Sequence, residues 1–299
     1  MKEIDIINTI TKEIGNKYLG DDCAFLKDLG IVVSQDSLVE NIHFKRNWCS
    51  AYQLGYKSIA VSISDILASG AEPKYVTIAL SLPNDINENY IKDFYSGAKS
   101  ALYGAEIVGG DITGSKTDIM VSVTAIGSIK GKNISSRSLA KEGYAVITKG
   151  NHGSSSSGLL ELQKGGNNLE LIKAHLEPKL EYDFSKQIST IVEEDYAMMD
   201  TSDGLADALY KIAEASNVKI MVDYTKVPHL DNIEKEQVLF GGEDYKLVAA
   251  IPNKYVSKID GAVVIGRVEA FDGARLEIAG KEYSSYDELN VYNHFGELS

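Results

Sequence analysis

The chain is poor in several residue types that mark particular classes of protein. Among its 299 residues are only two cysteines, one tryptophan and five prolines. Cys23 and Cys49 are too few for a disulfide framework and form no metal-ligand pattern, so we expect two reduced thiols in a cytosolic protein. No apolar run approaches the ~18 residues of a membrane span, and the acidic N-terminal segment is unlike a signal peptide. We therefore expect a soluble, cytoplasmic protein.

Positive charge is also scarce. The chain has 30 Lys and Arg against 43 Asp and Glu, a formal net charge of −13 and a pI of about 4.9. Such a chain repels nucleic acids and anionic membranes unless a local basic cluster overrides the net charge, and no such cluster is visible. We expect neither as a partner. A phosphate compound bound by this chain needs a cation as mediator, and the shortage of basic side chains favours metal ions.

Hydrophobic periodicity predicts helices and strands on both sides of one break near residues 130–138. Before the break we expect a helix over 3–13, strands around a Gly30 turn, a long helix ending at Gly70, a strand stopped by Pro83, a helix over 88–103, and strands over 105–113 and 118–129, the first ending in a Gly-Gly-Asp turn. After it we expect strand 143–149, helices within 155–191, strand 196–200, helix 204–215, and strands 218–223, 246–251 and 262–268. The alternation predicts two mixed α/β domains, 1–135 and 136–299.

Six aspartates share an unusual setting. Each is flanked by Gly, Ser or Thr and by apolar residues, at the end of a predicted buried element or inside an apolar helix: Asp21, Asp36, Asp65, Asp111, Asp200 and Asp203. An isolated buried carboxylate is costly unless it is paired, and basic partners are missing from these segments. Oxygen-only ligands suit Mg²⁺, which also bridges to phosphates.

A simpler interpretation exists for each aspartate. In "YAMMDTSDGLADAL", residues 196–209, a predicted strand hands over to a helix at Asp200 and Asp203. One aspartate at a helix N-terminus is ordinary capping, because that end carries partial positive charge. Two within four residues can instead hold a cation. For a single aspartate the sequence leaves both interpretations open; a shared metal site explains all six together.

Other motifs narrow the chemistry further. The chain has no G-x-x-x-x-G-K-[ST], no H-R-D or D-F-G pair and no H-E-x-x-H. "GNHGSSSSGLL" lacks a phosphate-binding lysine, which favours a loop that caps a helix. His43 follows an apparent strand, and a lone histidine is most often structural. In "LFGGEDYKLV", Gly-Gly before Glu243 and Asp244 either allows close approach of a ligand or forms a hairpin turn.

Taken in order, the motifs resemble those of a known family. They are "LGDDCAF", "VVSQDSLVENIHF", "SIAVSISDILASGAEP", "IALSLP", "IVGGDIT", "VSVTAIG", "MMDTSDGLADAL" and "LFGGEDYKL". This set resembles thiamine-monophosphate kinase, of the superfamily that also holds aminoimidazole ribonucleotide synthetase, selenophosphate synthetase and a hydrogenase maturation factor. The resemblance runs from about residue 15 to the tail. "LVENIHF", "DTSDGL" and "GGEDY" together favour the thiamine-phosphate branch.

The resemblance implies a fold, a reaction and a set of site residues. The fold is two α/β domains of the aminoimidazole ribonucleotide synthetase-like type, and the reaction is in-line phosphoryl transfer from ATP to thiamine monophosphate with several Mg²⁺ ions. It implies metal ligands at Asp21, Ser34, Gln35, Asp36, Asp65, Asp111, Asp200 and Asp203. It implies ATP contacts at Gly110, Asp111, Arg137 and Ser202, with Asp203, Asp111 and Arg137 central to catalysis. It implies substrate contacts at His43, at Glu243 or Asp244, and at a C-terminal aromatic, taken as Tyr292.

Three positions depart from the family pattern: Gln35 stands for a usual Thr, Ile112 for another, and Asn293 for a common Asp beside Tyr292. Among the rivals, the hydrogenase maturation branch needs a C-terminal cysteine, which this chain lacks, and Cys23 looks structural where the selenophosphate branch has a reactive residue. Aminoimidazole ribonucleotide synthetase differs in its substrate motifs. A metal–nucleotide sensor without turnover stays open, whereas a purely structural scaffold leaves the six aspartates unexplained. The family forms dimers through the N-terminal domain, which implies a homodimer.

Overall fold

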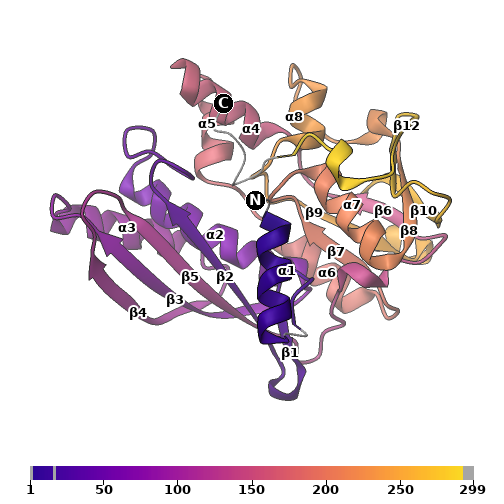
Figure 1. Ribbon diagram of the computed structural model, residues 1–299, viewed down its shortest axis with the longest axis horizontal. Helices are drawn as coiled ribbons and strands as arrows, with labels where there is room; N and C mark the ends of the chain where they lie inside the picture. The colour runs from indigo at the N-terminus through magenta and orange to yellow at the C-terminus, as the bar shows by residue number, and fades with distance from the viewer. Residues whose placement is uncertain (1–2, 16–17, 292–299) are drawn as a thin grey trace.

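The computed structural model describes residues 3–15 and 18–291, and they form two β-sheets with helices packed against each (Figure 1). The strands before residue 129 make a five-stranded sheet, and those after residue 144 make a seven-stranded one. The predicted boundary at 135/136 falls within the connection between the two sheets. No helix among these residues is both long and apolar enough to cross a membrane.

The first sheet has the strand order β1-β2-β5-β3-β4, with β3 and β4 parallel and the other pairs antiparallel. Its strands are β1 (Ala24–Leu26), β2 (Ile31–Val39), β3 (Glu72–Leu82), β4 (Glu106–Gly114) and β5 (Met120–Ser128). Helix α1 (Glu3–Ile14) precedes them, and the short 3-10 helix η1 (Lys27–Leu29) joins β1 to β2. Alternate residues of β2, β3 and β5 are buried, as expected for a sheet covered on one face.

Helices α2 (Ala51–Ala68) and α3 (Glu88–Ser100) cover that face. Helix α2 begins with a capping box between Ser50 and Gln53 and is followed by Gly70 in the left-handed region, at φ +72. It is buried along most of its length, which explains why its sequence is apolar nearly all round. Helix α1 differs, since Ile7, Ile10 and Ile14 are all exposed.

The second sheet has the order β12-β11-β8-β10-β6-β9-β7. Its strands are β6 (Ala145–Thr148), β7 (Ala197–Asp200), β8 (Val218–Val222), β9 (Leu247–Ile251), β10 (Val263–Ala270), β11 (Leu276–Ile278) and β12 (Lys281–Tyr283). Its helices are α4 (Ser154–Lys164), α5 (Leu169–Leu176), α6 (Tyr182–Ile191), α7 (Leu205–Ser216), α8 (Lys235–Phe240) and α9 (Asn253–Val256), with 3-10 turns η2 (Arg137–Leu139), η3 (Tyr224–Lys226) and η4 (Tyr286–Glu288).

The two parts share a hydrophobic core. Buried residues of the first sheet and α2 form one continuous cluster with α6, β7 and β9 of the second part. A second cluster lies between α7 and the rest of the second sheet. Helix α2 therefore packs on the first sheet with one side and on the second part with the other, which places its side chains at the seam between them.

The predicted elements are largely confirmed, with four differences, the first being that the short helices α8 and α9 have no counterpart among the predicted elements. Gly109, Gly110 and Asp111 do not form a turn but continue β4, parallel to β3. Gly110 allows β4 to lie this close to β3, because a Cβ at this position would lie 1.8 Å from the carbonyl oxygen of Ile78. Helix α3 ends at Ser100, before the predicted limit, and the tail contains the hairpin β11–β12, whose strands are too short for a periodic signal.

Close packing of α2 on α3 depends on two glycines. A Cβ on Gly97 would lie 1.8 Å from the carbonyl oxygen of Tyr52, and one on Gly55 would lie 1.9 Å from that of Phe94. Since helix backbones cannot yield locally, we expect Gly97→Ala to lower the free energy of unfolding by about 1–3 kcal/mol despite the better helix propensity of alanine. Urea denaturation measures this. Gly114→Ala is the control, with no atom within 4 Å of the new Cβ; equal stability of both variants would contradict the packing argument.

Candidate active site

Three aspartates from distant parts of the chain meet at the seam. Asp22 precedes β1, Asp65 lies on α2 and Asp200 ends β7, and each offers a carboxylate oxygen within 4.8 Å of the other two. Asp36, on β2, joins this group electrostatically, because it raises the pKa of Asp65. Four carboxylates thus converge where α2 touches both sheets.

Burial and mutual repulsion disfavour the charged forms of these acids. Burial, followed by the charge of Asp22, raises the pKa of Asp200 to about 7. Burial and then the charge of Asp36 raise the pKa of Asp65 well above its usual range, and burial raises that of Asp36. The Oδ2 atom of Asp36 is buried and accepts no hydrogen bond within the described chain. These acids offer only oxygen ligands, and they repel one another. Such a set fits a divalent cation such as Mg²⁺.

Two serine hydroxyls orient the cluster. Ser34, on β2, donates from its Oγ to Oδ2 of Asp65, and Ser64, on α2, donates to Oδ2 of Asp200 at 2.5 Å. The predicted ligand Ser34 therefore lies beside the cluster. Gln35 points to the opposite face of the sheet, where it bonds to side chains of β5. Only its backbone remains on the side of the acids.

The "GDD" motif separates into two roles. Asp21 accepts hydrogen bonds from the Ser136 hydroxyl at 2.9 Å and from the backbone N–H of Arg137 at 2.7 Å, so it holds the start of η2. Asp22 enters the carboxylate cluster and pairs with the guanidinium of Arg137 at 2.8 Å. Sequence analysis named Asp21 and missed Asp22. The available signal was their adjacency, because neighbours in an extended chain point to opposite sides.

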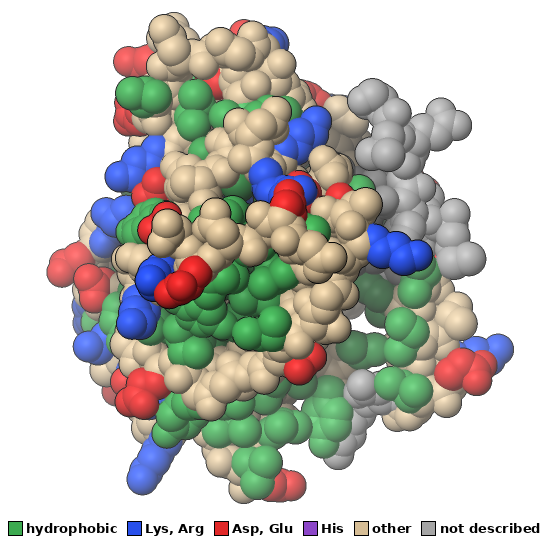
Figure 2. Space-filling view, turned by 90° about the vertical axis from the view of Figure 1, so that its left-hand side faces the viewer, with side chains coloured by type: hydrophobic (Ala, Val, Ile, Leu, Met, Phe, Trp, Pro, Cys, Tyr) green, Lys and Arg blue, Asp and Glu red, His purple; other side chains and the backbone are tan. Residues whose placement is uncertain are grey.

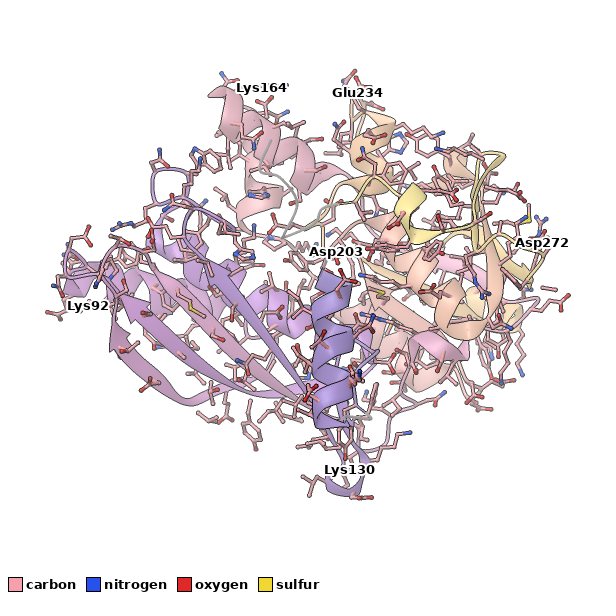
Figure 3. The ribbon with its side chains drawn as sticks, in the orientation of Figure 1. Lys92, Lys130, Lys164, Asp203, Glu234 and Asp272 are labelled. Atoms are coloured by element: carbon pink, nitrogen blue, oxygen red, sulfur yellow. The ribbon has the colours of Figure 1, made fainter. Side chains whose placement is uncertain are left out.

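The turn after β7 carries Ser202 and Asp203. The N–H of Ser202 bonds to Oδ1 of Asp200 at 3.3 Å, which ties the turn to the cluster. Asp203 is 37% exposed and pairs with Lys211 of α7 at 3.1 Å, and Lys211 also pairs with the buried Asp207 at 2.8 Å. In Figure 3 Asp203 lies near the middle of the molecule, between the two parts.

Gly110 and Asp111 lie apart from the cluster within one chain. The sheet register runs from Asp36 through Val123 and Ile78 to Gly110, three strand spacings or about 14 Å. Asp111 pairs with Ala79 and so points to the other face of the sheet from Ile78. It is exposed on the edge strand β4.

A small cavity of about 60 Å³ opens between the two parts. It is lined by Asn41, Ile42, His43, Phe44, Lys45 and Trp48 from the segment after β2, and by Leu159, His175 and Glu243 from the second part. His43 is held by the backbone N–H of Val39, which donates to its Nδ1 at 3.0 Å. The N–H of Glu243 donates to the carbonyl oxygen of Ser202 at 2.7 Å, which ties this cavity-lining residue to the turn that follows Asp200.

The two acids of "GGED" face different ways. Asp244 is 4% exposed, and its carboxylate accepts hydrogen bonds from the N–H groups of Gly153 and Ser155 at the start of α4. The serine-rich segment is therefore not the helix-capping loop expected from the sequence: its serines form the first turn of α4, and Asp244 supplies the cap. Glu243 instead lines the cavity. The predicted aromatic contact, Tyr292, lies outside the described residues.

The raised pKa of Asp200 predicts a pH-dependent effect of Mg²⁺. In the absence of metal, the Asp200 carboxyl of the folded chain stays protonated up to about pH 7. In the unfolded chain its pKa has the usual value of 3.8, so it has already lost its proton there. Stability should therefore fall by about 1–4 kcal/mol as the pH rises from about 4 through about 7. A bound cation removes this penalty, so Mg²⁺ should raise the thermal midpoint more at pH 8 than at pH 5.

Thermal unfolding at both pH values, with EDTA or Mg²⁺, measures the effect. Asp200→Asn should flatten the pH dependence in EDTA and shrink the Mg²⁺ shift. Asp93→Asn, on the exposed surface of α3, is the control and should behave as the unaltered chain. An equal Mg²⁺ shift at pH 5 and pH 8 would argue against a metal held by the cluster.

Comparison with known proteins places these features in a family. Residues 20–129 match the family model described as AIR synthase related protein, N-terminal domain. The thiamine-monophosphate kinase of Bacillus subtilis (strain 168) is 33% identical over 99% of this chain and 100% of that protein.

Two solved structures are similar along nearly their whole length. One, described as AaThiL complexed with AMPPCP and TMP, has a TM-score of 0.89 and 32% identity, covering 98% of this chain and 97% of that one. The other, a thiamine monophosphate kinase from Aquifex aeolicus, has a TM-score of 0.83 and 33% identity, covering 95% and 98%. With the expected fold found and the sequence aligned from end to end, the chain belongs to the thiamine-monophosphate kinase family.

Proposed function

We propose that the chain transfers a phosphoryl group from ATP to thiamine monophosphate, giving thiamine diphosphate and ADP. The observation that carries the proposal is the buried cluster of Asp22, Asp65 and Asp200, which lacks a resident counter-charge sufficient for its acids and adjoins a cavity between the two parts. The family supports the substrates, because a similar structure is described as binding AMPPCP and TMP. A soluble, cytoplasmic location is part of the same proposal.

The chain's own residues provide positioning and charge compensation, which are the main requirements of phosphoryl transfer. Bound Mg²⁺ neutralises phosphate charge and the charge that develops in the transition state. Asp22, Asp36, Asp65 and Asp200 would hold it, with Ser34 orienting Asp65. Asp203 adds a carboxylate from the adjoining turn.

Two further groups are proposed to contact the phosphates of ATP. Arg137 presents a guanidinium whose Nε is buried without a partner in the described chain, so it can still donate to an anion. Ser202 lies just before the N-terminus of α7, where the helix favours negative charge. On the acceptor side, His43 and Glu243 line the cavity, and we assign Glu243, whose carboxylate faces it, to the amino-bearing ring of thiamine monophosphate.

We also propose a homodimer formed through the edge strand β4. All but one of its residues are exposed, including Val108 at 54% and Ile112 at 68%. A long exposed strand with apolar side chains is a site of association unless it is covered. Figure 2 shows hydrophobic side chains gathered at this end of the molecule, with charged side chains around them. Gly110 and Asp111 lie on β4, so their proposed ATP and metal contacts would be made at the subunit interface.

The test of the reaction is chemical. Pure protein with Mg²⁺, ATP and thiamine monophosphate should form thiamine diphosphate, detected as its fluorescent thiochrome after oxidation, and the product should require both ATP and Mg²⁺. Asp203→Asn should lower kcat by about 10²-fold or more, since an amide holds Mg²⁺ poorly. The fold should persist, because Lys211 keeps Asp207 as its partner.

Asp183→Asn, exposed on α6, is the matched control and should retain full turnover. Turnover of Asp203→Asn equal to that of the unaltered chain would remove Asp203 from the mechanism. If the unaltered chain forms no thiamine diphosphate while ATP and Mg²⁺ still bind, the chain is instead a sensor or acts on another substrate.

The dimer is tested by sedimentation. We expect the unaltered chain to sediment as a dimer and the double variant Val108→Lys with Ile112→Lys to sediment as a monomer, because two charges on the edge strand oppose burial of that strand. Leu169→Lys, which alters an exposed apolar residue at the start of α5 in the second part, should leave the dimer intact. A monomeric unaltered chain would refute the assembly.

A further inference from the structure

Helix α2 carries a line of polar side chains that face the second part of the molecule. Gln53, Lys57 and Ser64 fall within about 40° of one another around the helix, given its ~100° per residue. Each contacts an acid of the second part. The contacts are Gln53 with Glu177 at 3.1 Å, Lys57 with Glu243 at 3.0 Å, and Ser64 with Asp200 at 2.5 Å. Among these three, Lys57 is the one whose partner, Glu243, lines the cavity.

Lys57 is an unusual residue for its position. Its side chain is only 3% exposed, on a helix that is buried along most of its length. The Nζ of Lys57 forms an ion pair with Glu243. It makes no hydrogen bond of good geometry within the described chain. Burying a charged pair stabilises a fold weakly at best, compared with an apolar side chain of the same shape. Stability therefore does not explain a buried lysine at this position, whereas its contact with Glu243 can.

Glu243 is held in a strained position at the cavity wall. Its φ of +66 lies in the left-handed region, which a residue with a side chain rarely adopts. Its N–H is fixed to Ser202, and its Oε2 lies 3.5 Å from Nδ1 of His175. The Lys57 contact at Oε1 completes this hold and sets the direction of the carboxylate. Lys57 itself does not line the cavity, so it reaches a ligand through Glu243.

We propose that Lys57 is a positioning residue for the acceptor substrate: from the N-terminal domain, its ammonium group holds the Glu243 carboxylate at the cavity wall, where it accepts hydrogen bonds from an amino-bearing ring. The identity of that ring rests on the proposed function. The hold of Lys57 on Glu243 does not, because it is a contact within the protein.

Trp48, the single tryptophan of the chain, lines the same cavity and reports binding without turnover. Quenching of its fluorescence by thiamine monophosphate should give a Kd for the unaltered chain, for Lys57→Met, for Glu243→Gln and for the double variant. Lys57→Met should weaken binding by at least about tenfold while the KM for ATP stays within about twofold. The double variant should bind no more weakly than Glu243→Gln alone, because Lys57 acts through Glu243.

Two further proteins separate positioning from a general structural effect. Lys57→Arg retains a cation and should recover part of the binding that Lys57→Met loses. Lys219→Met removes another buried lysine, 4% exposed and paired with acids on the outer strands of the second sheet, and should bind as the unaltered chain. Unaltered binding by Lys57→Met, or full additivity of its loss with that of Glu243→Gln, would overturn the inference.

Failure of the proposed function gives a different pattern. In that case the unaltered chain itself does not bind thiamine monophosphate. The same four proteins then decide the inference by urea unfolding, where losses of stability from Lys57→Met and Glu243→Gln should be non-additive if the two side chains hold each other. Additive losses would overturn the inference whatever the substrate.

Discussion

The structure is organised around the repulsion between carboxylates buried at the seam of its two parts. Asp22, Asp36, Asp65 and Asp200 come from four separate parts of the chain. Burial and the charge of Asp22 raise the pKa of the other three, so folding alone brings these acids together at a cost. Arg137 offsets part of this charge through its ion pair with Asp22. In the function proposed above, a divalent cation would offset the rest and link the acids to phosphate, so the same repulsion that destabilises the fold would favour binding of the metal.

Helix α2 is the element that makes the arrangement possible. It is buried nearly all round because the first sheet covers one side and the second part covers the other. Its few polar residues are therefore placed at the seam, where Asp65 joins the cluster and Lys57 holds Glu243. Helix α2 thus connects the carboxylate cluster with the cavity-lining Glu243, and the hydrogen bond from Glu243 to Ser202 connects Glu243 with the turn that follows Asp200.

Much of the fold was predictable from the sequence, because the long elements have clear periodicity: α2, β2, β3 and β5 are confirmed close to their expected limits. What the sequence pattern does not show is which strands pair with one another, and the errors arise there. Residues 109–111 look like a turn because of their glycines, yet β3 supplies a partner that makes them a strand. The short hairpin β11–β12 likewise exists by pairing with β8 rather than by its own pattern.

The site shows the same limit at the level of single acids. Asp21 and Asp22 are equivalent in sequence, as are Glu243 and Asp244, but in each pair one carboxylate faces backbone N–H groups that are already close by. That acid caps a helical turn and is satisfied by the protein. Its neighbour, turned the other way, pairs with a basic side chain and is the acid proposed to face a cation or a substrate. Whether an aspartate caps or binds is thus decided by the donors that tertiary structure brings to it, which neighbouring sequence does not record. Resemblance to a family located the motifs, and the distribution of donors selects the acid within each motif.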